Sequence, residues 1–551
     1  MENPKAIVDE IPTVRSLFAK FERINDPLLS SFISAVPGRF SDLATYLEGL
    51  NRPANKSIMY NRSILNSFAL KFHKDAGTLT SGVEQSAQKL CDPNTLLLVS
   101  THQPNLFAYS GVFKKIVLLE TLKRSVNKAS PEKSIVNIFL IVDHDFIDEV
   151  WVRLAQLPSI QHSSGILDLR FPVPSSQKWQ MVHAVPPPGR TIVENWKKQI
   201  RSWIKKLSAS GNLSRESAMA NLDRFWPEVE AALSRAKSYA DFNSFIMSRV
   251  VNSAWEYDTL FVRLSEISAA FKSGYEFLVS NSDKYSETLK NAEIAFMRHG
   301  IDTGVSFSSH AYSPLWLHCT CGSKAPVRLY KNPRPMLAGQ CMSCKRDLEV
   351  LLSSHSNPDL SADINRLSPR AIPIPLLLSR DLQIACYASG TGGIGYLMDM
   401  AFIAKKLSID LPQIAIWPSR DIYCGIGQAD ALAAMHGIQE DIDPFLQRLY
   451  QRNEEYENRI RPLIAERSRK NSSGEPMDPV LEQLFALKEE QRLLRKMIKL
   501  AEKVRNAVNL SPCFIDYLVN FGVSETEKRW RTHLLQKDNL ALPVLFDLPL
   551  T

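Results

Sequence analysis

Residues 94–102 read NTLLLVSTH and residues 135–145 read IVNIFLIVDHD, and these two stretches give the clearest indication of the fold class. Each is a short apolar run of the kind that forms a strand buried on both faces. Between them, the loop QPNLFAYSG leads into GVFKKIVLLETLKRSV, whose apolar residues recur at helical spacing. Strand, loop, helix and strand in this order predict a βαβ unit and therefore a parallel sheet.

A second unit of the same kind follows much later in the chain. LQIACYAS is a strand-like run, SGTGGIG a glycine-rich turn, YLMDMAFIAKKLSI a helical stretch and PQIAIWPS a further strand. Just before them, LSPRAIPIPLLL (367–378) also looks like a strand. The sequence therefore predicts an α/β fold in which one parallel sheet is interrupted by insertions.

The rest of the chain surrounds these two halves of the core. Residues 429–508 have the pattern of two long charged helices joined by the polar turn NSSGEPMD, which predicts an antiparallel coiled-coil hairpin with a kink or a new start at Pro462. The expected segments are an N-terminal helical segment (1–90), the first half of the core (91–190), a helical insertion (191–310), a cysteine-containing ribbon (311–354), the second half of the core (355–428), the hairpin (429–508), and a C-terminal segment that docks on the core (509–551).

The composition indicates a folded chain rich in helices. The 551 residues are 44% hydrophobic, which excludes a disordered chain, and glycine, at 22 residues, is too scarce for a turn-dense all-β fold. No run of about 18 uncharged apolar residues occurs. The first residues, MENPKAIVDEIPTV, lack the basic start and apolar stretch of a signal peptide. We therefore expect a soluble cytoplasmic protein with no membrane segment.

The net charge restricts the partners only slightly. Lysine and arginine (66) exceed aspartate and glutamate (58) by eight, and the two signs are interleaved. The longest basic-biased stretch, RIRPLIAERSRK (459–470), has the pattern of a solvated helix end. The surplus suits a small anionic substrate and a nucleotide, and we do not expect nucleic acid as a partner.

Four of the eight cysteines fall close together. Cys319 and Cys321 form one pair, and Cys341 and Cys344 form a second pair. Four thiolates on two close turns satisfy tetrahedral zinc, and four protein ligands leave no open position for chemistry. The sequence predicts a structural zinc ribbon. The alternatives are that His318 replaces Cys319 as a ligand, or that the thiols hold no metal.

Polar side chains follow each of the first two predicted strands. The first group can hold a phosphate or carboxylate beside a helix N-terminus. The second group comes directly after a buried strand, where ionisable side chains are costly unless they bind something. The alternative for both groups is an ordinary hydrogen-bonded loop. The residues are His102, Gln103 and Asn105 after the first strand, and Asp143, His144 and Asp145 after the second.

The glycine-rich turn SGTGGIGY (389–396) lets the backbone pass close to a ligand at the mouth of a helix. It lacks the G-x-G-x-x-G register followed by a spaced acid, so a general anion or substrate loop is favoured over a dinucleotide site. A tight strand-to-helix turn is the alternative. The candidate binding residues are Gly390, Thr391, Gly392, Gly393 and Tyr396.

The three polar loops, in this order, resemble those of the bacillithiol biosynthesis cysteine-adding enzyme family. The matching stretches are THQPNLFAYSG, VDHDF, LSPRAIPIPLLL and ASGTGGIGYLMDMAFIAKKLSIDLP, followed by the long helical hairpin. The chain departs from the family in having THQPN where members carry G-Q-Q-x-G, and in having a cysteine ribbon.

The resemblance implies a Rossmann-like core of the nucleotidyltransferase type, a coiled coil that forms a homodimer, and a ligase that joins cysteine to an amino-sugar-type acceptor. It places His102, Gln103 and Asn105 on the loop that lines the active-site cleft, with the 143–145 stretch beside them and Gly390 to Gly393 across from them.

Amide formation from a carboxylate needs activation, so such a ligase requires ATP or a related nucleotide, donors for developing phosphate charge and an unprotonated amine. We expect His102 and the glycine amides to serve the phosphate, and Asp143, His144 or Asp145 to serve the amine. Lys114 and Lys115 are candidate phosphate partners or simply an exposed helix face. The alternative function is a non-catalytic zinc-ribbon and coiled-coil adaptor that binds protein or nucleic acid.

Overall fold

The computed structural model describes residues 36–207, 215–298, 303, 305, 307–435, 441–474, 476 and 478–546. The beginning of the expected N-terminal helical segment and the last five residues of the expected C-terminal segment lie outside these ranges. None of the helices described is both long enough and apolar enough to cross a membrane.

A parallel sheet of five strands forms the centre of the molecule, as the sequence predicted. The strands lie in the order β13 (Gln413–Ile416), β12 (Cys386–Ser389), β1 (Leu96–His102), β2 (Ile135–Ile141) and β5 (Leu260–Arg263). All four neighbouring pairs are parallel. Numbered along the chain, these strands are therefore the fifth, fourth, first, second and third. From β1 the chain adds β2 and β5 on one side, and it later adds β12 and β13 on the other side.

One strand lies where only helices were expected. β5 belongs to the 191–310 stretch, and it pairs with β2 to form an edge of the sheet. The stretch is otherwise helical, with α8 (Arg190–Lys206), α9 (Arg215–Arg235), α10 (Tyr239–Ser248), the π-helical turn η4 (Arg249–Ala254), α11 (Lys272–Ser280) and α12 (Ser282–Arg298). A four-residue strand between helices leaves too short an alternation for its pattern to stand out.

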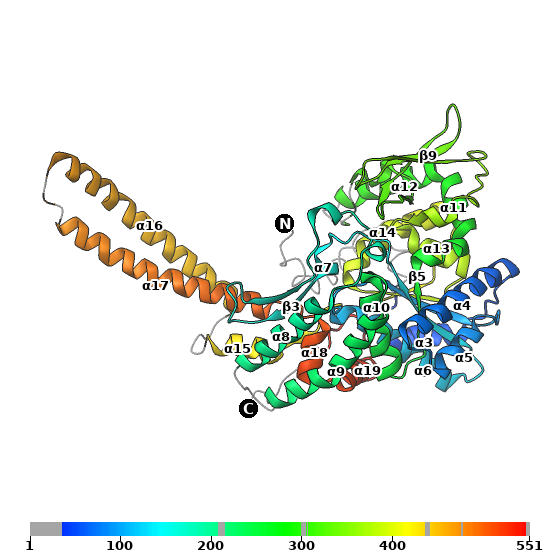
Figure 1. Ribbon diagram of the computed structural model, residues 1–551, viewed down its shortest axis with the longest axis horizontal. Coiled ribbons are helices and arrows are strands. Elements are labelled where there is room, and N and C mark those ends of the chain that lie inside the picture. Colours follow the sequence, from blue (N-terminus) through cyan, green and yellow to red (C-terminus); the bar gives the residue numbers. More distant parts are fainter. Residues whose placement is uncertain are drawn as a thin grey trace.

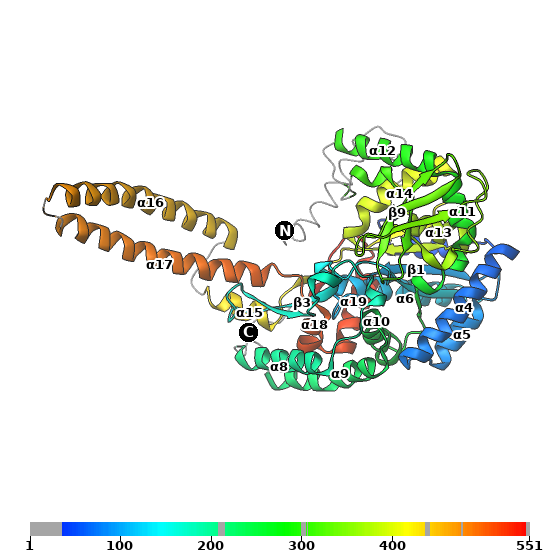
Figure 2. The same cartoon turned by 45° about the horizontal axis from the view of Figure 1, so that its top comes forward.

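Alternate strand residues point to opposite sides of the sheet, and here both sides carry apolar residues. Helices therefore cover both faces. Leu98 and Phe139 belong to one hydrophobic core, while Leu97 and Ile138 belong to the other. Figure 2 shows α8, α9 and α18 below the sheet and α11, α13 and α14 above it. The further helices are α3 (Phe40–Gly49), α4 (Lys56–Ala76), α5 (Ser81–Lys89), α6 (Ser110–Ala129), α7 (Val150–Arg153), α13 (Pro373–Leu382), α14 (Ile394–Leu407), α15 (Ile426–Ala433), α18 (Phe514–Phe521) and α19 (Val523–Lys537).

The expected strand at 367–378 is mostly a helix. Only β11 (Leu367–Pro369) is extended, and α13 begins at Pro373. Pro373 and Pro375 lie in the first turn of this helix, where the missing N–H groups would have no intrahelical acceptor. The prolines that suggested a non-helical run therefore mark a helix start.

The cysteine-containing stretch folds into small antiparallel sheets. β11 pairs with β6 (Leu315–His318), which pairs with β7 (Lys324–Pro326). A second sheet contains β8 (Arg328–Tyr330), β9 (Met336–Gln340) and β10 (Asp347–Leu351). Leu315, Leu317 and Leu337 are buried in the same core as the upper face of the main sheet, so this ribbon is packed against the α/β body.

Two long helices, α16 (Ile442–Ser473) and α17 (Asp478–Val508), project from the body as an arm (Figure 1). α16 runs without interruption through Pro462, so this proline does not start a new helix. Most of the buried residues of α17 recur at alternating steps of four and three, from Val480 through Leu484, Leu487, Gln491, Leu494 and Ile498 to Ala501.

The C-terminal segment docks on the body. β15 (Leu545–Phe546) pairs with β14 (Ile422–Tyr423), and Phe546 is buried. The remaining strands, β3 (Leu154–Pro158) and β4 (Ile166–Arg170), form a separate antiparallel pair.

Candidate functional site

The predicted polar loops lie at one edge of the main sheet. Because the strands are parallel, their carboxyl ends share an edge, and β1 ends there at His102, β2 at Ile141 and β12 at Ser389. The chain leaves β1 and β12 in opposite directions across the sheet, and open α/β sheets place ligands in the crevice at such a point. Segments far apart in the sequence thus meet at this edge.

Ser419, in the loop after β13, is the point on which the other loops converge. Its hydroxyl lies 3.2 Å from both the backbone N and the hydroxyl oxygen of Thr391, and its carbonyl accepts a hydrogen bond from Ser110. A Cβ at Gly390 would overlap Ser419 Oγ, and one at Gly111 would lie 2.7 Å from Ser419 Cβ. No local sequence pattern distinguishes Ser419, so it was not among the predicted site residues.

The imidazole of His102 is neutral and held in place. Nδ1 lies 3.0 Å from the Gln103 carbonyl oxygen and donates to it, so Nε2 accepts from the Tyr109 hydroxyl at 2.9 Å. Burial lowers the pKa of His102 to about 3, and the nearby Lys115 ammonium adds to this lowering. Both ring nitrogens are therefore occupied by the protein itself.

Lys115 is buried at the same edge. Its ammonium donates to the Thr101 carbonyl at 2.7 Å, and the side chain is only 7% exposed. No carboxylate pairs with it among the residues that the structure describes. Burial lowers the pKa of Lys115 to about 7. The alternative of an exposed helix face is therefore wrong for this residue.

Lys114 is buried as well, but its charge is matched. Its ammonium contacts Asp421 Oδ1 at 2.5 Å and the Pro418 carbonyl at 2.6 Å, and it lies over the Trp417 ring. The other oxygen of Asp421 accepts hydrogen bonds from Tyr517 and Trp530. Lys114 thus ties α6 to the C-terminal helices, and its charge is neutralised within the protein.

The two predicted amides after β1 differ. Gln103 is satisfied: its Nε2 donates to Asp145 at 2.7 Å, and its Oε1 accepts from the Trp151 indole at 2.8 Å. Asn105 is 2% exposed, and neither atom of its carboxamide has a hydrogen-bond partner among the described residues. An unpaired buried amide costs about 1–3 kcal/mol, so its position calls for a partner that the protein does not supply.

The 143–145 stretch divides into three environments. Both carboxylate oxygens of Asp143 accept from Ser265, at 2.9 and 2.5 Å, so this side chain fastens the turn to the loop after β5. His144 donates from Nε2 to the Pro369 carbonyl, and burial holds its pKa well below the usual range. Asp145 alone keeps an accessible carboxylate, with its side chain 28% exposed.

The glycine-rich turn occupies the mouth of a helix, as expected. Gly390 precedes the short 3-10 turn η9 (Thr391–Gly393), and α14 follows with no side chain capping its first turn. Thr391 is buried, Gly392 is exposed, and Tyr396 is 40% exposed. Helix α6 likewise begins near this edge without a side-chain cap. Two helix N-termini therefore lie at this edge, and neither is capped by the side chain of its own N-cap residue.

The four predicted metal ligands come together. The sulfur atoms of Cys319, Cys321, Cys341 and Cys344 all lie within 4.8 Å of one another, so the cluster could hold a metal ion such as zinc. Two of the sulfur pairs are 3.6 and 3.5 Å apart. His318 Nε2 instead contacts Ser368 Oγ at 2.8 Å, which favours Cys319 over His318 as the fourth ligand.

Each pair of cysteines lies on a tight turn whose next residue has a left-handed backbone. Gly322 has φ +86°, and Lys345 has φ 61°. The amides of these residues donate to the carbonyls of Cys319 and Cys341. The two turns thus present their thiolates toward a common point, as four-cysteine zinc sites do.

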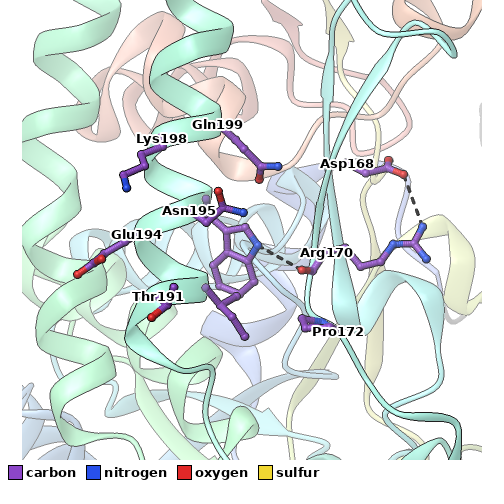
Figure 3. A pocket seen from close by; sticks show the side chains of 10 residues that line it. Asp168, Arg170, Pro172, Thr191, Glu194, Asn195, Lys198 and Gln199 are labelled. Carbon is purple, nitrogen blue, oxygen red and sulfur yellow. Dashed lines mark hydrogen bonds and ion pairs between the residues drawn. The ribbon is translucent and has the colours of Figure 1, made fainter.

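A cavity of about 420 Å³ lies elsewhere, between β4 and α8 (Figure 3). Arg170 and Asp168 form an ion pair of 3.6 Å at its wall, and the Trp196 indole donates to the Arg170 carbonyl. None of the residues singled out from the sequence lines this cavity.

The sheet edge therefore combines a buried lysine without a carboxylate, an unpaired amide and two helix N-termini, next to a histidine whose ring nitrogens are both hydrogen-bonded within the protein. This set can bind an anion. A search against models of known protein families finds no match for this chain, and a search of curated proteins finds none either.

Proposed function

We propose that this protein is an enzyme that binds a nucleotide-activated, anionic substrate at the β1/β12 crevice and forms a carbon–nitrogen bond there. The buried ammonium of Lys115, left without a carboxylate, is the single observation that carries the proposal. A buried cation without a counter-ion costs free energy in the empty protein. A phosphate or carboxylate would supply the missing charge.

The sheet order supports a Rossmann-like type of core. Counted along the chain, the order third, second, first, fourth, fifth is the one found in dinucleotide-binding sheets, which bind ligands at the crevice beside the first strand. Fold type alone does not assign a reaction, so the assignment rests on the side chains.

Those side chains suit a substrate pair with opposite charges. Lys115 donates to the carbonyl of Thr101, the residue before His102, and Asp145 accepts from Gln103, the residue after it. Lys115 and the helix N-termini suit the phosphate of an activated carboxyl group. The Asp145 carboxylate is partly exposed, although Lys324 lies 3.5 Å from one of its oxygens, and it suits the ammonium group of an incoming amino acid, which is cysteine by the family resemblance. The Asp143 carboxylate serves the fold instead.

Calorimetric titration with ATP tests the binding step. We expect Lys115→Met to weaken binding at least tenfold, and Lys128→Met, on the exposed end of the same helix, to leave it unchanged. Turnover is tested by incubating the protein with ATP, cysteine and amino-sugar acceptors and detecting the amide by mass spectrometry. The absence of both nucleotide binding and amide formation across that panel would contradict the proposal.

We also propose that the cysteine cluster holds one structural zinc ion. Four protein ligands complete a tetrahedral site, and bound metal would hold the small ribbon folded. Elemental analysis should find about one zinc per chain, and replacing Cys341 with serine should abolish it. A folded ribbon without metal would refute this assignment.

The arm supports a further proposal, a homodimer. The alternating four- and three-residue steps of α17 suit coiled-coil packing against α16. This pairing leaves other apolar side chains of α17 in solvent: Phe485 is 71% exposed, Leu493 56% and Met497 46%. A second copy presents the same surface, so one two-fold contact would cover both. Sedimentation equilibrium should give a dimer that Leu493→Glu with Met497→Glu dissociates, whereas Lys496→Glu should not.

One observation favours the adaptor alternative. Arg461, Arg467 and Arg469 are exposed near the end of the arm, and none of them has an ion-pair partner among the described residues. Such a surface can attract a nucleic acid through its phosphates. Gel-shift titration distinguishes the alternatives: binding that falls steeply with salt, survives His102→Ala and is lost when these arginines become glutamate would favour the adaptor.

A further inference from the structure

The ribbon is joined to the sheet edge through backbone hydrogen bonds. The amide of Met181 donates to the carbonyl of Gly322, in the first cysteine turn, at 2.8 Å. The next two amides, of Val182 and His183, donate to the carbonyls of Asp145 and Asp143 at 2.8 and 3.0 Å. The short turn η3 (Val182–Ala184) therefore bridges the cysteine turn and the loop after β2.

Lys324 provides a second connection, through its side chain. Its backbone lies between the two cysteine turns, because its carbonyl accepts from Met342 and the preceding Ser323 carbonyl accepts from Cys319. Four ligands on one ion would fix both turns, and with them the position of the Lys324 backbone. Lys324 is only 1% exposed, so the side chain has little freedom of its own.

The Lys324 ammonium reaches the candidate site. It lies 3.5 Å from Asp145 Oδ1 and over the rings of Phe146 and Trp316, at 4.6 and 4.5 Å from their centroids. The other oxygen of Asp145 accepts from Gln103, the residue after β1. A continuous chain of contacts thus runs from the cysteine turns through Lys324 and Asp145 to the loop that carries His102.

We propose that metal binding at the four cysteines sets the geometry of the sheet-edge site, and that Lys324 is the positioning residue that transmits it to Asp145 and Gln103. The inference rests on the proposed function in one respect, namely that this sheet edge is a substrate site. The ribbon then holds the substrate loops in place, and we call this role the brace. Loss of the metal should loosen those loops while the sheet itself remains folded, because the strands are held by their own ladder and two hydrophobic cores.

Hydrogen–deuterium exchange of the full chain, with zinc bound and after chelation, tests the mechanical step without any substrate. We expect chelation to speed amide exchange at least tenfold in 143–147 and 181–184 as well as in the ribbon, and to leave 96–100 and 386–389 unchanged. Acceleration confined to 315–352 would overturn the inference.

Zinc-loaded variants isolate the side-chain connection. Lys324→Met should speed exchange in 102–106 and 143–147 with zinc content unchanged, and Lys324→Arg should restore most of the protection. The matched control is Lys331→Met in the same ribbon, whose ammonium pairs with Asp283 at the surface. If Lys324→Met does not fold, Asp145→Asn provides the same test. Wild-type exchange in either folded variant would overturn the role of Lys324.

ATP binding separates this inference from the proposed function. If chelation and Lys324→Met loosen the loops and also weaken ATP binding at least tenfold, both are supported. If the loops loosen but no form of the protein binds ATP, the brace stands and the ligase proposal fails. If chelation leaves exchange in 143–147 unchanged, the inference is overturned whether or not ATP binds.

Discussion

Two neighbouring lysines on α6 differ in whether the protein neutralises their charge. We call the part of the sheet edge where it does so the closed region, and the part where it does not the open region. In the closed region, Lys114 is neutralised by Asp421, which two further donors also satisfy. In the open region, Lys115 is equally buried but meets only the Thr101 carbonyl. Burial alone therefore does not mark a binding residue. The distinction lies in whether the protein supplies the counter-charge, and the predictions below test that distinction.

The largest effect should separate the two lysines directly. Lys114→Met leaves Asp421 as an uncompensated buried charge and should lower the free energy of unfolding by about 3–5 kcal/mol. Lys115→Met removes an uncompensated charge and should leave stability unchanged or raise it. Urea denaturation of both variants measures the difference. Equal destabilisation would show that Lys115 also belongs to the closed region.

The crowding around Ser419 gives a smaller effect. An alanine at Gly390 meets only the Ser419 hydroxyl, whereas an alanine at Gly111 meets its Cβ and backbone. Each substitution should cost about 1–3 kcal/mol, as overpacking does. Adding Ser419→Ala should rescue Gly390→Ala and fail to rescue Gly111→Ala. Thermal denaturation of the four variants measures this, and rescue of both would contradict the arrangement of the loops.

The open region should also make stability depend on pH. The pKa of Lys115 is lowered from 10.5 to about 7 in the folded chain, so between these values the unfolded state binds more protons. Stability should therefore rise with pH across this window, by up to about 1.4 kcal/mol per pH unit from this group, and the rise should disappear in Lys115→Met. A bound anion favours the charged lysine, so anion affinity should fall as the pH passes 7. Urea midpoints at several pH values test the first claim, and an unchanged slope in the variant would contradict it.

The smallest effect concerns the orientation of Gln103. Trp151 is 47% exposed and donates its indole N–H to Gln103. Trp151→Phe should cost about 0.5–1 kcal/mol, because water replaces part of the lost hydrogen bond. Val150→Ala, at an exposed neighbour, is the matched control for denaturation. A cost above that range would place Gln103 in the closed, structural part of the edge.

The features that followed from the sequence were local. Strands buried on both faces carry continuous apolar runs, which is why β1, β2, β12 and β13 were expected, and the spacing of the two cysteine pairs predicted a cluster that could hold a metal ion. The four-residue β5 left too little pattern, and the prolines of α13 suggested the wrong element because they lie in its first turn.

The roles of individual polar residues depended on distant partners. Asp143 is held by Ser265, far along the chain, and no local signal distinguishes this aspartate from Asp145. Lys114 has a carboxylate partner, Asp421, and Lys115 has none among the described residues. One signal was present: α6 is apolar around most of its circumference in GVFKKIVLLETL, and a helix covered on all sides must bury its lysines too.

The arm also affects how the molecule moves in solution. α16 and α17 extend well beyond the body on one side (Figure 1). An asymmetric particle experiences more friction than a sphere of equal mass, so a monomer should show an enlarged Stokes radius and tumble faster about its long axis than across it. A dye whose transition dipole is held parallel to the arm should therefore report a longer rotational correlation time than one held perpendicular to it.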